Sequence, residues 1–109
     1  MNKTKLSALF AVSACLLLTL PVKAIAADGA ELYKTKTCTA CHGKDAKTPI
    51  MPSYPKLAGQ NAAYALQQMQ DIKSGARANG LSAGMKGVMH LVSEDEMKAL
   101  ADYISSLQP

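Results

Sequence analysis

The apolar positions of this chain form one continuous run and several shorter amphipathic stretches. The continuous run covers residues 6–20. In two later stretches, apolar side chains recur at steps of three and four residues, which is the period of one helix face. The pattern predicts helices from Asn61 to about Ser74 and from Ser93 to about Leu107. The apolar members of these two faces are Ala62, Ala65, Leu66, Met69 and Ile72, and then Met97, Leu100, Ala101, Ile104 and Leu107.

Capping residues mark where the helices begin. Asp28 is suited to cap a short first helix over residues 28–34, because its carboxylate can accept from the first backbone N–H groups. Ser93 and Glu96 have the spacing of a capping box at the start of the last helix. The sequence therefore predicts an all-α domain of short helices.

Two segments lack a helical period and are predicted as loops. Residues 43–54 contain the polar residues Lys44, Asp45, Lys47 and Thr48, and Pro52 and Pro55 stiffen the end of this loop. Residues 75–92 contain repeated glycines, so we expect a loop there with at most one turn of helix.

The start of the chain has the three parts of a secretory signal peptide. Residues 1–5 are basic, the apolar run follows, and the small residues 24–26 resemble a cleavage site. The run is shorter than the roughly 20 apolar residues that a membrane-spanning helix needs. We therefore expect residues 1–26 to be removed on export, which leaves residues 27–109 as one domain with no membrane insertion.

A second processing route remains open at Cys15. Residues 12–15 resemble the cleavage box of a bacterial lipoprotein, which would make Cys15 a lipid-bearing N-terminus. The residues that follow Cys15 are apolar, whereas a lipoprotein usually carries a polar tether there. Signal-peptide cleavage is the main prediction.

Export changes the charge of the molecule. The whole chain has a formal net charge of +4, from 12 basic and 8 acidic side chains. Removal of the signal takes Lys3, Lys5 and Lys23 but no acidic residue, so the remaining net charge is only +1. The basicity belongs to the precursor and therefore does not predict nucleic-acid binding or attraction to an anionic membrane.

The predicted domain also has little material for a hydrophobic core. It contains no Trp, and the only Phe lies in the signal segment. Domains of this size usually need a staple or a prosthetic group to fold. We expect the domain to be mostly unfolded without such a group.

One short motif predicts that group. Cys38 and Cys41 are separated by two residues and followed at once by His42, which is the attachment pattern of a c-type haem. One helical turn brings both thiols to the two vinyl groups of the porphyrin, and the imidazole then binds the iron. The motif predicts one covalently bound haem c, with iron as the metal.

Other uses of this motif fit less well. A zinc site needs a second pair of ligands, and outside the motif the chain offers only Cys15 and His90. A thioredoxin-like redox pair would follow a strand, and residues 33–37 do not have a strand pattern.

The sixth ligand of the iron decides what the haem can do. Met85, Met89 and His90 are the candidates, and Gly84 and Gly87 give the chain around Met85 freedom to bend. A filled sixth position leaves no site for oxygen or peroxide, which predicts one-electron transfer and no enzyme activity. An open position would instead predict a haem enzyme or a gas sensor.

These residues together resemble the small bacterial class I cytochromes c, and in particular single domains of the tandem two-haem periplasmic cytochromes c. The likeness covers nearly all of the predicted domain. The stretches that carry it are 29–33, 38–43, 52–60, 68–75, 93–96 and 100–103.

The resemblance adds expectations about single residues. It implies that Met85, eight residues before Ser93, is the sixth ligand. It implies that the Pro52 carbonyl accepts a hydrogen bond from His42, and that Gly29 lets Tyr103 approach closely. Its class I fold packs short helices around one haem.

The resemblance also suggests partners. A periplasmic electron carrier would connect a membrane oxidoreductase with a terminal oxidase or reductase, and would be a monomer. Alternatively, the chain would be the cytochrome subunit of a periplasmic dehydrogenase, for example a flavoprotein that oxidises a sulfur compound. Lys44, Lys56 and Lys86 are candidates for steering an acidic partner.

Overall fold

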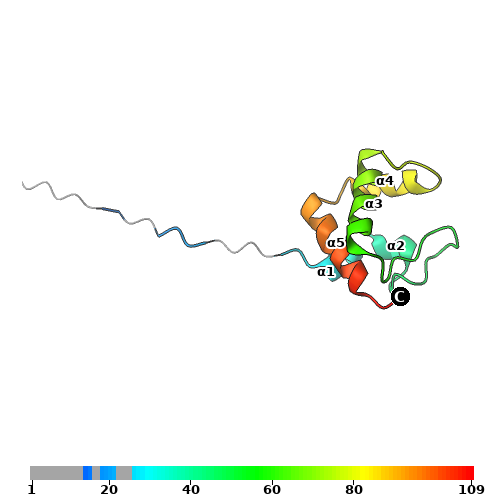
Figure 1. The fold of residues 1–109 in the computed structure, drawn as a ribbon, viewed down its shortest axis with the longest axis horizontal. Helices are drawn as coiled ribbons and strands as arrows, with labels where there is room; N and C mark the ends of the chain where they lie inside the picture. Colours follow the sequence, from blue (N-terminus) through cyan, green and yellow to red (C-terminus); the bar gives the residue numbers. More distant parts are fainter. Residues whose placement is uncertain (1–13, 16–17, 22–25) are drawn as a thin grey trace, which may run out of the picture.

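The structure, a computed structural model, describes residues 14–15, 18–21 and 26–109 (Figure 1). Within these residues the chain forms five helices and no strands. Most of the predicted signal segment lies outside these residues. No helix within them is long and apolar enough to cross a membrane. The all-α prediction is confirmed. The helices are α1 (Gly29–Thr35), α2 (Cys38–His42), α3 (Ala62–Ser74), α4 (Ser82–Met89) and α5 (Glu94–Ser106).

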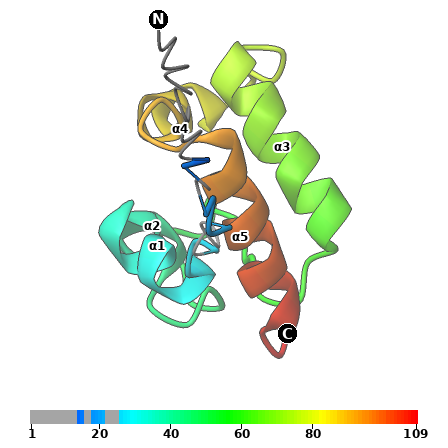
Figure 2. The same cartoon turned by 90° about the vertical axis from the view of Figure 1, so that its left-hand side faces the viewer.

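Helix α5 is the centre of the packing. Both α1 and α3 lie against it, while α4 packs on α3 and α2 on α1 (Figure 2). The predicted apolar face of α5 is buried at Met97, Leu100, Ala101 and Ile104. The rest of the core comes from Tyr33, Ala46, Met69, Ile72, Met89 and Val92.

The caps predicted from the sequence form as expected. The Asp28 carboxylate accepts hydrogen bonds from the backbone N–H groups of Ala30 and Glu31. At the start of α5 the Ser93 hydroxyl accepts from the Glu96 N–H at 3.3 Å, and the Glu96 carboxylate accepts from the Ser93 N–H at 2.9 Å. Each cap satisfies N–H groups that the first helical turn leaves without partners.

The loop predicted for residues 75–92 is wrong in part, because α4 occupies its second half. Glycine lowers helix propensity, and the Leu81 side chain makes no cap, so local sequence gives little support to this helix. Packing against α3 supplies the stabilisation instead, with Met89 almost fully buried at 1% exposure. Met85 therefore lies on a helix and not on a flexible loop.

Gly29 allows α1 and α5 to touch. A Cβ atom at this position would lie 2.2 Å from the Ala99 carbonyl oxygen and 2.6 Å from the Tyr103 Cβ. The contact brings the rings of Tyr33 and Tyr103 to a centroid distance of 5.7 Å. The close approach of Tyr103 to Gly29 is confirmed.

Replacing Gly29 by alanine should separate these two helices. We expect Gly29→Ala to lower the free energy of unfolding of the protein by about 2–4 kcal/mol, because the clash is with backbone that cannot rotate away. The measurement is urea unfolding followed by far-ultraviolet circular dichroism. Gly87→Ala in α4 is the matched control: its Cβ meets no atom within 4 Å, so it should be neutral or raise stability by up to about 1 kcal/mol. Equal losses in the two variants would contradict this account.

Candidate functional site

Helix α2 presents the two cysteines of the haem motif on a single turn. Cys38 and Cys41 are three residues apart and therefore face the same side of the helix. Both are half-buried, and their sulfurs are not joined in a disulfide. His42, the last residue of the helix, is buried at 8% exposure. The structure thus brings the three predicted attachment residues together.

The imidazole of His42 is oriented by the backbone of the following loop. Its Nδ1 lies 2.9 Å from the carbonyl oxygen of Pro55. A carbonyl can only accept, so Nδ1 carries the proton and Nε2 keeps the lone pair that binds a metal.

The expectation that the Pro52 carbonyl would accept this bond is wrong. Residues 51–54 form a turn that contains Pro52, in which the Tyr54 N–H donates to the Met51 carbonyl at 3.0 Å. Pro55, three residues later, then lies beside His42. The acceptor is thus a proline carbonyl, as expected, but that of Pro55, three residues further along the chain than Pro52.

The loop after the motif is tied to α1 and α2. The Tyr33 hydroxyl donates to the Gly43 carbonyl at 2.8 Å, and the Ile50 N–H donates to the Cys41 carbonyl at 3.1 Å. Gly43 has a φ of 83°, and a Cβ there would lie 2.3 Å from the Thr48 carbonyl oxygen. Only glycine fits this position, so the exit of the chain from α2 is fixed.

A further bond network closes the same loop. The buried Ala46 carbonyl accepts from the N–H groups of Leu57 and Ala58, at 2.8 and 3.1 Å. The Asp45 carboxylate accepts from the backbone N–H groups of Lys47 and Thr48, and these bonds hold its pKa below the usual range. The bonds to Ala46 therefore hold the chain just after Pro55, and the Asp45 bonds close the turn that contains Ala46.

The surroundings of Cys38 favour an uncharged sulfur. Burial raises the pKa of the Cys38 thiol to about 11. A zinc site would require a thiolate there, and the described residues contain no group of three His, Cys, Asp or Glu side chains able to hold a metal. A neutral thioether suits this environment better than a metal-bound thiolate.

The candidates for the sixth ligand differ in exposure. Met89 is buried in the core at 1%, and His90 is exposed at the end of α4. Met85 is half-buried on the same helix and keeps part of its surface free. Of the other described methionines, Met69 and Met97 are buried in the core, whereas Met51 is 39% exposed.

Comparison with known proteins decides the family. The profile of the family described as "Cytochrome c" matches residues 26–108. This chain belongs to the cytochrome c family. It is 40% identical over 102 residues to cytochrome c4 of Stutzerimonas stutzeri, which covers 84% of this chain and 48% of that protein.

Other relatives differ in length. The chain is 34% identical to the "Thiosulfate dehydrogenase electron acceptor" of Stutzerimonas stutzeri, over 83% of this chain and 44% of the relative. It is 36% identical to cytochrome c-553 of Nitratidesulfovibrio vulgaris, over 91% of this chain and 96% of the relative. The chain thus spans less than half the length of the first two relatives, and nearly all of the third.

The fold agrees with the family. The crystal structure of reduced cytochrome c4 from Pseudomonas stutzeri superposes with a TM-score of 0.65 and 33% identity, over 73% of this chain and 46% of that one. The class I cytochrome c fold is confirmed. Members of the family carry covalently bound haem c, so haem c with its iron is the cofactor of this chain. The donor set at α2 fits that group: two neutral sulfurs on one turn and an imidazole with Nε2 available.

Tyr33 should make the stability of this site depend on pH. Burial, followed by nearby ionisable groups, raises the pKa of Tyr33 above its ordinary value of about 10. The unfolded chain then loses this proton at lower pH than the folded protein does. The contribution of Tyr33 to stability is therefore complete below about pH 10 and is lost as the pH rises above it.

Replacing Tyr33 by phenylalanine tests this directly. Tyr33→Phe should lower the free energy of unfolding by about 1–3 kcal/mol at pH 7, because the Gly43 carbonyl loses its buried donor. The difference from the parent protein should shrink as the pH rises above about 10 in urea unfolding of the ferrous protein. Tyr64→Phe, at an exposed tyrosine of α3, should change neither quantity. A pH profile unchanged by Tyr33→Phe would contradict the assignment.

Proposed function

We propose that this chain is a periplasmic one-electron carrier in which Cys38 and Cys41 hold haem c and His42 and Met85 bind its iron. When bound, haem c supplies an iron that alternates between the ferric and ferrous states. The observation that carries the proposal is the Nδ1–Pro55 hydrogen bond, which leaves Nε2 of His42 as the metal-binding atom on the helix that bears both cysteines.

The chain's own residues would limit the chemistry to electron transfer. A histidine and a methionine together fill both axial positions, and a thioether ligand favours the ferrous state and so raises the reduction potential. Pro55 fixes the imidazole, and the packing of α4 on α3 would fix Met85. Neither ligand then needs to move when the charge of the iron changes.

Redox partners would dock at the surface beside Cys41, where Ile50 and Met51 are exposed. The Ile50 N–H is bonded to the Cys41 carbonyl, so Ile50 lies beside the attachment site, and its side chain is 66% exposed. Met51 follows it and is also exposed. Exposed apolar side chains beside the cofactor favour a small, transient interface of the kind that redox proteins form. We call Ile50 and Met51 the apolar rim.

The proposed function as a periplasmic electron carrier also implies partners and a location for the protein. The donor would be a membrane oxidoreductase and the acceptor a terminal oxidase or reductase. Bacterial relatives of this family typically work in the periplasm, in keeping with removal of residues 1–26. The intact mass of the purified protein would show residues 27–109 plus haem if this is right, and a lipid-modified N-terminus if Cys15 is processed instead.

One relative favours a second candidate function. The Stutzerimonas stutzeri protein named for accepting electrons from thiosulfate dehydrogenase shares 34% identity with this chain. A chain of this kind could serve as the cytochrome partner or subunit of a periplasmic dehydrogenase that oxidises a sulfur compound. Co-purification with a larger dehydrogenase subunit would support this function, whereas purification as a monomer would support the free carrier.

The sixth ligand can be tested with two methionine variants. Met85→Ala should bind carbon monoxide in the ferrous state at pH 7 and lose the ferric near-infrared band of sulfur ligation, because it opens the sixth position. Met89→Ala should do neither, but should lower the free energy of unfolding by about 2–5 kcal/mol, because it leaves a cavity in the core. If Met89→Ala bound carbon monoxide and Met85→Ala did not, Met89 would be the ligand. Carbon monoxide binding by the parent protein would favour an enzyme or sensor.

The apolar rim can be tested by electron self-exchange between ferric and ferrous copies of the chain. Ile50→Lys should slow self-exchange by about tenfold, because it removes an apolar contact and adds like charges to both copies. NMR line broadening in mixtures of the two redox states measures the rate. Leu91→Lys is the matched control, since Leu91 is 68% exposed in the turn between α4 and α5. Equal slowing by both variants would rule out a specific role for the rim.

A further inference from the structure

The connection between α3 and α4, residues 75–81, contains the dipeptide Asn79–Gly80. In Figure 1 this connection leaves the top of α3 and turns back into α4 as an open loop. Residues 78–81 are all exposed to solvent. The proposed electron transfer uses none of these four residues.

The chain is fastened on either side of Asn79–Gly80 but not at the dipeptide itself. Before it, the Arg77 N–H donates to the Asp71 carbonyl at 3.0 Å, and after it the Ser82 N–H donates to the Asn79 carbonyl at 3.1 Å. Within the part of the chain that the structure describes, the Asn79 side-chain amide and the Gly80 N–H make no hydrogen bond. Both groups are therefore free to react with each other.

The reaction open to them is deamidation. The Gly80 backbone nitrogen attacks the Asn79 side-chain carbonyl carbon, which closes a succinimide ring and releases the side-chain nitrogen as ammonia. Water then opens the ring at either carbonyl and leaves aspartate or isoaspartate. The net change is one water consumed and one ammonia released, and no electrons are transferred.

Gly80 removes the usual steric obstacle to this reaction. A side chain on the residue after asparagine shields the attacking nitrogen, and glycine has none. A Cβ atom at Gly80 would meet no atom within 4 Å, so neighbouring residues leave this position open as well. Glycine also gives the backbone the freedom that ring closure needs.

Asn61, the other asparagine of the described residues, lacks these features. Its side-chain oxygen accepts from the Tyr64 N–H at 3.0 Å as the cap of α3, and Ala62 follows it. The hydrogen bond holds the side-chain carbonyl in the cap, and the methyl group of Ala62 shields the next nitrogen. Asn61 is thus an internal control for Asn79.

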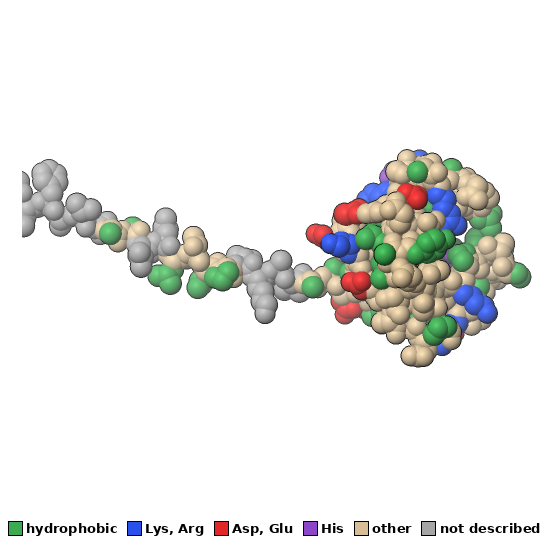
Figure 3. All heavy atoms as spheres, in the orientation of Figure 1, with side chains coloured by type: hydrophobic (Ala, Val, Ile, Leu, Met, Phe, Trp, Pro, Cys, Tyr) green, Lys and Arg blue, Asp and Glu red, His purple; other side chains and the backbone are tan. Residues whose placement is uncertain are grey.

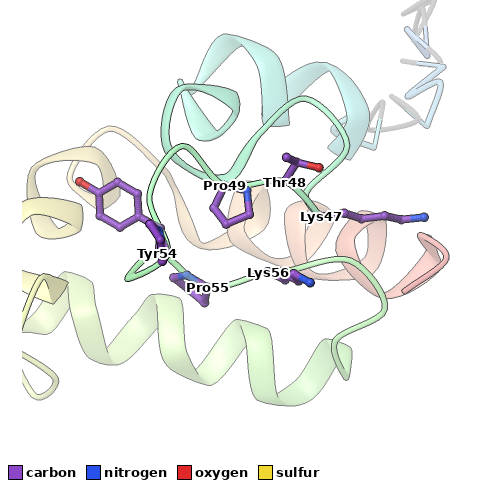
Figure 4. A pocket seen from close by; sticks show the side chains of 7 residues that line it. Lys47, Thr48, Pro49, Tyr54, Pro55 and Lys56 are labelled. Carbon is purple, nitrogen blue, oxygen red and sulfur yellow. The ribbon is translucent and has the colours of Figure 1, made fainter.

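The long connection between α2 and α3 offers no comparable site. It surrounds a cavity of about 830 Å³ that side chains from both halves of the loop line (Figure 4). Residues 43–60 contain no asparagine. Asp45, which could form the same ring, is held by hydrogen bonds from the N–H groups of Lys47 and Thr48.

We propose that Asn79 deamidates spontaneously in the folded protein, and that the isoaspartyl product loosens α4. An isoaspartyl link lengthens the backbone by one carbon atom and takes the Asn79 carbonyl, which accepts from the Ser82 N–H, out of the main chain. The turn that starts α4 is thereby disrupted, and α4 has no side-chain cap to replace it. A normal aspartate keeps the backbone and adds a negative charge near the positive end of α4, which is favourable.

The consequence for electron transfer rests on the proposed function, in which Met85 is the sixth ligand. Met85 lies one turn after Ser82 on α4. A looser α4 would release this thioether in isoaspartyl molecules and leave it in place in aspartyl ones. Deamidation would therefore inactivate part of an ageing population of the carrier.

Peptide mapping of the haem-loaded protein during incubation at mildly alkaline pH tests the site. Asn79 should gain the mass difference between an amide and an acid at least about tenfold faster than Asn61. Its rate should also lie within about tenfold of the rate in the synthetic peptide of residues 78–86, because the fold does not shield it. A protein-isoaspartate methyltransferase should label the product, and Asn79→Gln should abolish the labelling.

Hydrogen exchange tests the effect on α4. The isoaspartyl fraction, separated by ion exchange, should exchange the amides of α4 at least about tenfold faster than the parent protein. Asn79→Asp is the matched control, because it adds the same charge with a normal backbone and should exchange them no faster than the parent.

Two results would overturn the proposal. One is a rate at Asn79 in the folded protein more than about tenfold below that in the peptide. The other is unchanged exchange of α4 in the isoaspartyl fraction. The ferric near-infrared band reports separately on Met85: if α4 loosens and the band persists, the ligand assignment fails while the modification stands.

Discussion

The hydrogen bond from Nδ1 of His42 to the Pro55 carbonyl joins the two parts of the molecule that form the candidate site. On one side is α2, a helix of five residues, which is too short to be stable alone. On the other is the long connection to α3, which contains no helix or strand. The bond gives the imidazole one orientation and one tautomer, and it places the loop where its backbone can serve the site.

This bond in turn depends on contacts that lie away from the site. Tyr33 of α1 holds the carbonyl of Gly43, and Ala46 holds the chain just after Pro55. Helix α1 is positioned by its contact with α5, which Gly29 makes possible. A chain of packing and hydrogen bonds thus runs from the central helix to the imidazole. The small core has little other material, so we expect a large covalently bound cofactor to contribute to stability as well as to function.

The sequence was a good guide wherever a single residue type determines local structure. The spacing of Cys38, Cys41 and His42 predicted the attachment turn, and the Ser93–Glu96 pair predicted the start of α5. It failed at α4, where Gly84 and Gly87 argue against a helix and only packing on α3 supports one. A weak signal was present there, because Met85, Val88 and Met89 have helical spacing.

The acceptor for His42 was missed for a different reason. Any residue of the loop can offer a carbonyl, so the sequence cannot identify which one reaches the imidazole. That choice depends on the turn at Met51–Tyr54 and on the bonds to Ala46, which are properties of the folded loop. Backbone acceptors in irregular loops are therefore the part of such a site that requires a structure.

The distribution of charge has a consequence for how the domain meets other molecules. After loss of the first 26 residues the net charge would be only +1, so overall attraction or repulsion is weak. Its charges are instead spread unevenly, because Asp28, Asp95 and Asp102 gather near the start of α1 and α5, with Lys98 beside them. Figure 3 shows most of the visible acidic side chains on the side of the start of α1, whereas basic side chains lie both there and on the opposite side. An uneven distribution of charge orients an approaching molecule without holding it. Orientation combined with weak attraction would suit the proposed carrier, which must bind and leave many times, because short-range contacts at the proposed apolar rim would then form and break quickly.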